Sequence, residues 1–224
     1  MNNAKLTPWI VAITFIALTL IGPALALQDI TADQIANAIE MEGPDTIAAV
    51  FMEPVQNTGG AFTPPDGYWA RVREICDRYG IVFIADEVMA GFGRTGSWFA
   101  IEHFDVVPDL ITFAKGSTSG YVPLGGVAIN DAIYATFADR PYPGGLTYSG
   151  HPLATACAVA TINAMTDEKM VENAARIGRD VLGPGLRELA DKHPSVGEVR
   201  GLGVFWAIEL VANQQTREPL APYG

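Results

Sequence analysis

The sequence contains few of the residues that hold metal ions or form disulfide bonds. Its 224 residues include two cysteines, Cys76 and Cys157, and three histidines, all far apart in the chain. A structural zinc site needs about four such ligands at short spacings, so none is expected here. The two cysteines are expected to be small buried residues instead.

Positive charge is scarce as well. Lysine and arginine together number 14, against 25 aspartates and glutamates, and the formal net charge is -11. Because nucleic acids and anionic membrane surfaces attract basic proteins, neither is expected as a main partner. Apolar residues are abundant, at 49% of the chain, which favours a folded protein of one or two domains.

Residues 1–28 form a hydrophobic leader that differs from the rest of the chain. Lys5 precedes an apolar stretch over residues 9–27, and the next charge is Asp29. A basic start, an apolar centre and the small-x-small sequence at residues 24–26 are typical of a secretory signal, and the stretch approaches the ~20 residues that span a bilayer. One interpretation is export or membrane anchoring. The other is an artefactual N-terminus read from displaced coding sequence.

From Asp29 onward the pattern is that of an α/β protein. A helix is predicted over residues 30–42, and a second one runs from a cap at Asp66 to about Tyr79, where Gly80 ends it. Predicted strands cover residues 47–52, 81–86, 108–114 and 124–129, helices follow from Pro152 and over 167–192, and 196–211 alternates like antiparallel strands. This order predicts a mostly parallel sheet with helical crossovers.

Two of the predicted strands end in a charged residue. Apolar residues 81–85 lead to Asp86, and residues 108–114 lead to Lys115. A buried strand tolerates such residues only when they are paired or functional. Because ligands collect at the carboxyl ends of parallel strands, a carboxylate and an amine are predicted to share a site there.

The glycine-rich stretch at residues 91–96 matches G-x-G-x-x-G by letter. In dinucleotide-binding proteins these glycines open a helix directly after a strand. Here Ser97, Trp98 and Phe99 follow without a helix start, and the stretch comes after Asp86 and Glu87 instead of a bare strand end. A dinucleotide site is therefore not predicted.

Several motifs occur in an order that resembles the class III aminotransferases, pyridoxal-phosphate enzymes of fold type I. They are Glu53-Pro54-Val55-Gln56, Asp86-Glu87-Val88, the sequence at 91–96, Pro108-Asp109 through Lys115-Gly116, Thr147 through Pro152, and Arg200-Gly201-Leu202-Gly203. The resemblance runs from about residue 30 to the end. It implies a mostly parallel large-domain sheet with helices on both faces and the start of a small α+β C-terminal domain.

The resemblance assigns roles to four residues. Lys115 would form an imine with the aldehyde of pyridoxal 5'-phosphate and move a proton at the substrate carbon. Asp86 would keep the ring nitrogen protonated, and Val88 would pack on the ring face. Thr147 would reach the phosphate of the neighbouring subunit's cofactor, which implies a homodimer with shared active sites.

Other motif residues receive weaker assignments. Glu53 and Gln56 are expected to be structural and near the site, with direct catalysis as the alternative. Arg94 fits a loop arginine as well as a site residue. His151 is expected to fix its loop and not to act as a catalytic base.

Two departures from the family's ornithine-type branch point to the donor. Met89 stands where that branch has glutamine, and Thr58 stands where it has a second acid. The acid serves glutamate's carboxylate in that branch. In lacking this acid, the sequence resembles the enzymes that transfer amino groups from ω-amino acids or amines, such as taurine, β-alanine or putrescine, to pyruvate.

The resemblance also implies that part of the enzyme lies outside this chain. The family's N-terminal segment, its phosphate-binding loop and its substrate-carboxylate arginine have no counterpart in the sequence. The expected organisation is the leader at 1–28, a partial cofactor-binding large domain at 29–155, and linking helices with a partial small domain at 156–224.

Two classes of function follow. The first is a pyridoxal-phosphate aminotransferase with a small-molecule amino donor and keto acid as substrates, cytoplasmic by resemblance, or exported if the leader is authentic. The second is an inactive fragment or exported remnant that keeps the fold. Within enzymes, a fold-type-I aminomutase or decarboxylase is the alternative chemistry.

Overall fold

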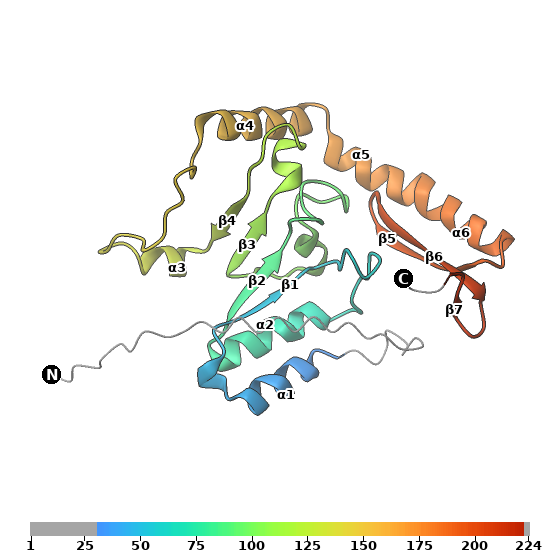
Figure 1. The fold of residues 1–224 in the computed structure, drawn as a ribbon, viewed down its shortest axis with the longest axis horizontal. Coiled ribbons are helices and arrows are strands. Elements are labelled where there is room, and N and C mark those ends of the chain that lie inside the picture. The colour runs from blue at the N-terminus through green and yellow to red at the C-terminus, as the bar shows by residue number, and fades with distance from the viewer. Residues whose placement is uncertain (1–30, 222–224) are drawn as a thin grey trace.

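The computed structural model describes residues 31–221, which form two sheets connected by helices (Figure 1). The first part contains α1 (Asp33–Glu42), β1 (Ala49–Met52), α2 (Tyr68–Tyr79), β2 (Val82–Asp86), β3 (Leu110–Phe113), β4 (Gly126–Ile129) and α3 (Asp131–Ala135). The second contains α4 (Pro152–Asp167), α5 (Met170–Ile177), α6 (Gly183–Lys192), β5 (Val196–Leu202), β6 (Phe205–Asn213) and β7 (Glu218–Pro219). Short 3-10 helices are η2 (Pro44–Thr46), η3 (Ala100–Phe104) and η4 (Lys115–Thr118), and a π-helical turn, η5 (Gly178–Leu182), joins α5 to α6.

The first sheet has the order β1-β2-β3-β4. β1, β2 and β3 are parallel, and β4 returns antiparallel to β3. The predicted strands are therefore confirmed, although each is one or more residues shorter than its apolar run. Since β1, β2 and β3 all point the same way, their carboxyl ends lie at one edge of the sheet, where Asp86 and Lys115 are found.

The main core lies between this sheet and helices α1 and α2. Residues alternate along a strand, so Phe83 and Ala85 of β2 enter the core while their neighbours point to the other face. In α2, Trp69, Val72 and Ile75 share one side of the helix, and the Trp69 ring stacks on Phe83 with centroids 5.5 Å apart. Figure 1 shows α1 and α2 side by side next to this sheet.

The start of α2 differs from the sequence prediction. Asp66 does not cap it: the residue before the helix is Gly67, with φ of 80°, and no side chain accepts a hydrogen bond from the first turn. The positive φ explains why a glycine precedes the helix, because glycine adopts positive φ at little energetic cost. The predicted end is confirmed, since Gly80 adopts a left-handed conformation and its N–H closes the last turn.

The second part packs β5 and β6, an antiparallel pair, beside the α5–α6 helix (Figure 1). The predicted strands around Gly201 and Gly203 are thus confirmed. At the π-helical turn the two backbones nearly touch, because a Cβ on Gly178 would lie 1.9 Å from the carbonyl oxygen of Gly203. Only glycine fits at this crossing.

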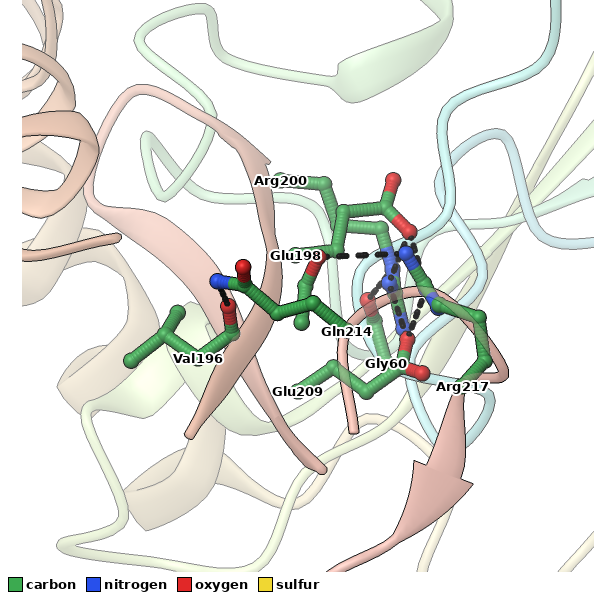
Figure 2. A network of polar contacts seen from close by, with 8 residues as sticks. Gly60, Val196, Glu198, Arg200, Glu209, Gln214 and Arg217 are labelled. Carbon is green, nitrogen blue, oxygen red and sulfur yellow. Dashed lines mark hydrogen bonds and ion pairs between the residues drawn. The ribbon is translucent and has the colours of Figure 1, made fainter. Parts of the chain in front are cut away.

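Four charged side chains form a cluster at the β5–β6 hairpin, and one of them reaches the loop after β1 (Figure 2). Arg200 and Arg217 each pair with both Glu198 and Glu209, at N–O distances of 2.7–3.0 Å. Arg200 also donates from Nε to the carbonyl of Gly60 over 2.7 Å. A pair of arginines and a pair of glutamates therefore compensate each other's charge, and one arginine also contacts the loop after β1.

No helix within residues 31–221 combines the length and apolar character needed to cross a bilayer. The predicted leader at residues 1–28 lies outside the described residues.

Candidate active site

Asp86 and Lys115 lie at the ends of neighbouring parallel strands, as predicted. Asp86 is the last residue of β2, and its strand partner in β3 is Thr112. Lys115 follows the end of β3 by two residues and begins η4. The carboxyl ends of the β2–β3 pair therefore place the carboxylate and the amine at the same edge of the sheet.

The Asp86 carboxylate is oriented by two hydrogen bonds to one of its oxygens. Oδ1 accepts from the Val88 N–H over 3.0 Å and from the Thr112 hydroxyl over 3.2 Å. Within the described part of the chain, no hydrogen bond engages Oδ2. The carboxylate is half-buried, so it is fixed in place and keeps one oxygen able to accept a proton donor.

Lys115 leaves the strand in an unusual backbone conformation. Its φ is 47°, in the left-handed region that non-glycine residues seldom adopt. The side chain is exposed, and Nζ donates to the thioether sulfur of Met89. The next residue packs tightly, because a Cβ on Gly116 would lie 2.5 Å from the Cβ of Phe92.

Glu53 is a third charged group at this edge. Burial raises the pKa of its carboxyl above the ordinary value, the Asn57 N–H lowers it, Asp86 raises it and Lys115 lowers it. The Asn57 N–H donates to Glu53 Oε2 over 2.9 Å. Glu53 is therefore held by its own loop within electrostatic range of both predicted site residues, consistent with a structural role near the site.

Glu87, next to Asp86, points to the opposite side and is fully buried. Its carboxylate accepts from the backbone N–H groups of Ala100 and Ile101 at 3.0 and 2.8 Å, which anchors the start of η3. Burial raises its pKa from 4.5 to about 7, against the lowering effect of those two hydrogen bonds. Glu87 is part of the sequence motif, but only the alternation of side chains along the strand indicates that its carboxylate points into the interior.

The remaining predicted residues lie in different environments. Val88 is half-buried directly after Asp86. Thr147 is exposed, in a turn between α3 and α4, and within residues 31–221 no hydrogen bond joins it to Asp86 or Lys115. His151 precedes α4, and its backbone carbonyl accepts from the Thr155 hydroxyl over 3.1 Å.

Arg94 is held as a loop residue. Its Nη1 donates to the carbonyl of Met89 over 2.6 Å, and its own carbonyl accepts from the Val204 N–H over 2.9 Å. The first contact fixes the backbone of the residue that touches Lys115. The second joins the glycine-rich loop to the β5–β6 hairpin. Residues 91–99 form turns and bends, and no helix begins at these glycines.

An open pocket of about 490 Å³ adjoins Lys115. Its lining consists of the glycine-rich loop, η4 and apolar residues of α4, α5 and the hairpin: Phe92, Gly93, Arg94, Met165, Met170 and Val204 among them. Asp86 and Val88 are not part of this lining. Lys115 itself therefore lines the pocket, whereas Asp86 lies outside the lining.

A family model described as aminotransferase class-III matches residues 5–222 of this sequence. The chain belongs to the class III aminotransferase family. The resemblance read from the ordered motifs is thereby confirmed, together with pyridoxal 5'-phosphate as the cofactor of that family.

Relatives with known names are aminotransferases. The chain is 45% identical over 194 residues to the putrescine–pyruvate aminotransferase of Pseudomonas aeruginosa, covering 86% of this chain and 42% of the relative. It is 39% identical over 196 residues to the taurine–pyruvate aminotransferase of Rhodobacter capsulatus, covering 85% and 42%. The chain thus spans about two fifths of the length of the curated relatives it matches.

Solved structures confirm the α/β fold of a pyridoxal-phosphate transaminase. The taurine:2-oxoglutarate aminotransferase from Bifidobacterium kashiwanohense, solved in complex with PLP and glutamate, matches with a TM-score of 0.82 and 46% identity. That match covers 86% of this chain and 43% of the other. A transaminase from the marine bacterium Virgibacillus matches with a TM-score of 0.81 and 47% identity, covering 85% and 44%.

The residues present fit one part of such a cofactor. A primary amine suits a covalent bond to an aldehyde, and a fixed carboxylate with an uncommitted oxygen suits a protonated ring nitrogen. The amine and the carboxylate both lie at the ends of adjacent strands. Met89 and Thr112 also touch these groups, and the sequence did not indicate either contact.

Proposed function

We propose that this chain carries the lysine and aspartate of a pyridoxal-phosphate aminotransferase site. The observation that supports it most directly is the Asp86 carboxylate and the Lys115 amine at the carboxyl ends of adjacent parallel strands. The proposed reaction moves an amino group from an ω-amino acid or amine to a keto acid such as pyruvate.

Each residue has a distinct proposed task. When bound, the cofactor supplies an electron-withdrawing ring that eases proton loss from the substrate carbon. Lys115 would bind the cofactor covalently through Nζ and, once displaced, would take and return the proton at that carbon. Asp86 would hold the ring nitrogen protonated through Oδ2, and Val88 would pack against the ring face.

The amine and pyruvate specificity rests on two positions and on the relatives. Met89 and Thr58 stand where the ornithine-type branch has a glutamine and a second acid. The named relatives act on putrescine or taurine with pyruvate. We infer that an amine, an ω-amino carboxylate or an ω-amino sulfonate is preferred as donor over an amino acid with an α-carboxylate.

We further propose that the enzyme is a homodimer. Thr147 is exposed on a segment that carries other exposed apolar side chains, including Leu146 and Tyr148. A second copy would cover this segment and receive Thr147 at its cofactor phosphate. The family resemblance favours a cytoplasmic location.

Borohydride trapping tests the proposal. The full chain is mixed with pyridoxal 5'-phosphate and reduced, and the modified lysine is mapped by mass spectrometry. Selective labelling of Lys115, lost in Lys115→Ala and kept in Lys169→Ala, is expected. Labelling spread over all lysines and unchanged by Lys115→Ala would contradict cofactor binding by this chain and favour the inactive remnant.

Product analysis then distinguishes the chemistry. A keto-acid-dependent gain of alanine from pyruvate identifies amino transfer. Loss of carbon dioxide from the donor, or an isomerised donor, would identify the decarboxylase or aminomutase alternative.

A further inference from the structure

The group nearest the reactive amine of Lys115 is a thioether. Lys115 Nζ donates to Met89 Sδ, and this contact joins residues 26 positions apart in the sequence. The backbone conformation is defined at both ends of this contact. Arg94 Nη1 fixes the Met89 carbonyl over 2.6 Å, and the left-handed φ of Lys115 sets the direction of its side chain. The placement of the two loops therefore brings the Met89 sulfur into contact with the Lys115 amine.

The charged groups around the amine do not compete with this contact. Asp86 and Lys115 both act on Glu53 through space, but within the described part of the chain neither the Glu53 nor the Asp86 carboxylate accepts a hydrogen bond from Nζ. Arg94 is occupied with the Met89 carbonyl. A thioether is a weak acceptor, so this contact orients the amine without a strong hydrogen bond.

We propose that Met89 is an oxidation site that controls the reactivity of Lys115. The oxidant is a peroxide. The Met89 sulfur attacks one peroxide oxygen, an S–O bond forms as the O–O bond breaks, and the proton of the attacked oxygen passes to the departing hydroxide to give water. The sulfur is oxidised by two electrons and the peroxide is reduced by two. Met89 is half-buried, which leaves it within reach of so small a reagent.

The product changes the acceptor that faces the amine. A sulfoxide oxygen is polar and accepts hydrogen bonds strongly, whereas the thioether does not. Hydrogen bonds to a charged group are stronger than neutral ones, so the sulfoxide favours the ammonium form of Lys115. Only the neutral amine attacks an aldehyde. Oxidised protein therefore reacts more slowly with aldehydes at a given pH.

This inference rests on the proposed role of Lys115, so its test uses an aldehyde that needs no cofactor site. The full chain is treated with hydrogen peroxide, and sulfoxide at Met89 is quantified by mass spectrometry, with the exposed Met41 as reference. Formaldehyde and cyanoborohydride then methylate the lysines. We expect methylation of Lys115 to slow by about tenfold relative to Lys169, and its pH profile to move upward by about one pH unit.

Two controls make the result decisive. Met89→Leu keeps the side-chain volume but removes the sulfur, so peroxide should no longer change Lys115 methylation, although Met165 and Met170 near the pocket remain oxidisable. Methionine sulfoxide reductase should restore the original rate in the unmutated chain. An unchanged Lys115 rate at full Met89 oxidation, an equal loss in Met89→Leu, or no recovery on reduction would each overturn the proposal.

The outcome is separable from that of the proposed function. If pyridoxal 5'-phosphate does not label Lys115 but formaldehyde reactivity still depends on Met89 oxidation, the aminotransferase proposal fails and this one stands. If the cofactor labels Lys115 equally before and after Met89 oxidation, with unchanged methylation, the reverse holds.

Discussion

At the scale of single residues, Asp86 and Glu87 show how position decides the behaviour of a carboxylate. Asp86 faces the half-exposed side of β2 and keeps an oxygen available, whereas Glu87 is sealed in the interior against η3. Both occur in one motif and are adjacent in the sequence, yet their side chains lie on opposite sides of the strand. The difference in burial therefore distinguishes Asp86, whose carboxylate is suited to binding, from Glu87, whose carboxylate stabilises the fold.

The raised pKa of Glu87 predicts a pH dependence of stability. Because its folded pKa of about 7 lies above the ordinary 4.5, its contribution to the free energy of unfolding is complete below about pH 4.5 and is lost as pH rises through about 7. The loss is on the order of 3 kcal/mol. Glu87→Gln removes this titration, so urea denaturation should show a flatter pH dependence in the variant between pH 4.5 and 7.

A matched control for that experiment is Glu168→Gln, because Glu168 is exposed just after α4. It should leave the pH dependence of the unmutated protein unchanged. Parallel curves for the unmutated chain and Glu87→Gln would show that the interior carboxylate does not titrate in this range.

At the scale of elements, the crossing of the π-helical turn with the β5–β6 turn has no room for a side chain. Gly178→Ala would place a methyl group 1.9 Å from a carbonyl oxygen, so one backbone must move. We expect a loss of about 3 kcal/mol in the free energy of unfolding. Gly185→Ala, in α6 of the same helical run, meets nothing within 4 Å and should stabilise by up to about 1 kcal/mol. Chemical denaturation of both variants checks the contrast.

The two arginines of Figure 2 make similar ion pairs but connect different elements. Arg200 reaches Gly60 and lies 3.9 Å above the Phe62 ring, whereas the Arg217 contacts stay within residues 197–209. Arg200→Lys should therefore increase amide hydrogen exchange in the loop at residues 57–62, and Arg217→Lys should not. We expect Arg200→Lys to cost about 2 kcal/mol, because a partly buried group loses its fork of donors.

Equal exchange in the two variants would contradict the inference that Arg200 alone connects the hairpin to the loop after β1.

At the scale of the whole molecule, the proposed dimer predicts a concentration-dependent association. Leu146 is 81% exposed beside Thr147, and Leu146→Asp would place a charge in the contact. Sedimentation should show a dimer for the unmutated chain and a shift towards monomer for Leu146→Asp. Met41→Asp changes an equally exposed side chain on α1 and should leave the association unchanged. A monomer at every concentration would contradict the dimer for this chain.

Much of the fold could be predicted from the sequence because apolar runs and punctuating glycines report burial directly. The runs that end at Asp86 and Lys115 predicted two adjacent strand ends, and Gly80 predicted the end of α2. The start of α2 was wrong, because a glycine with positive φ replaced a side-chain cap at Asp66. Either a side-chain cap or a glycine with positive φ can precede a helix, and tertiary packing decides which of the two is used.

The candidate site was predictable only where a motif named its residues. The contact between Lys115 and Met89 depends on how two loops meet, and no spacing along the chain encodes it. The same holds for the Arg200 bond to Gly60, which joins residues 140 positions apart. Long-range contacts of this kind arise from the packed structure as a whole.

The alternation of β2 carries a consequence for folding errors. If this strand paired with its neighbours one residue out of step, Phe83 and Ala85 would leave the core and Glu87 would move to the face where Asp86 now lies. Such a molecule would lose its apolar packing and its η3 anchor in the same step. Misaligned copies would therefore be unstable and open to proteolysis. The copies that persist would be those in which Asp86, and not Glu87, lies on the face of β2 where the site is.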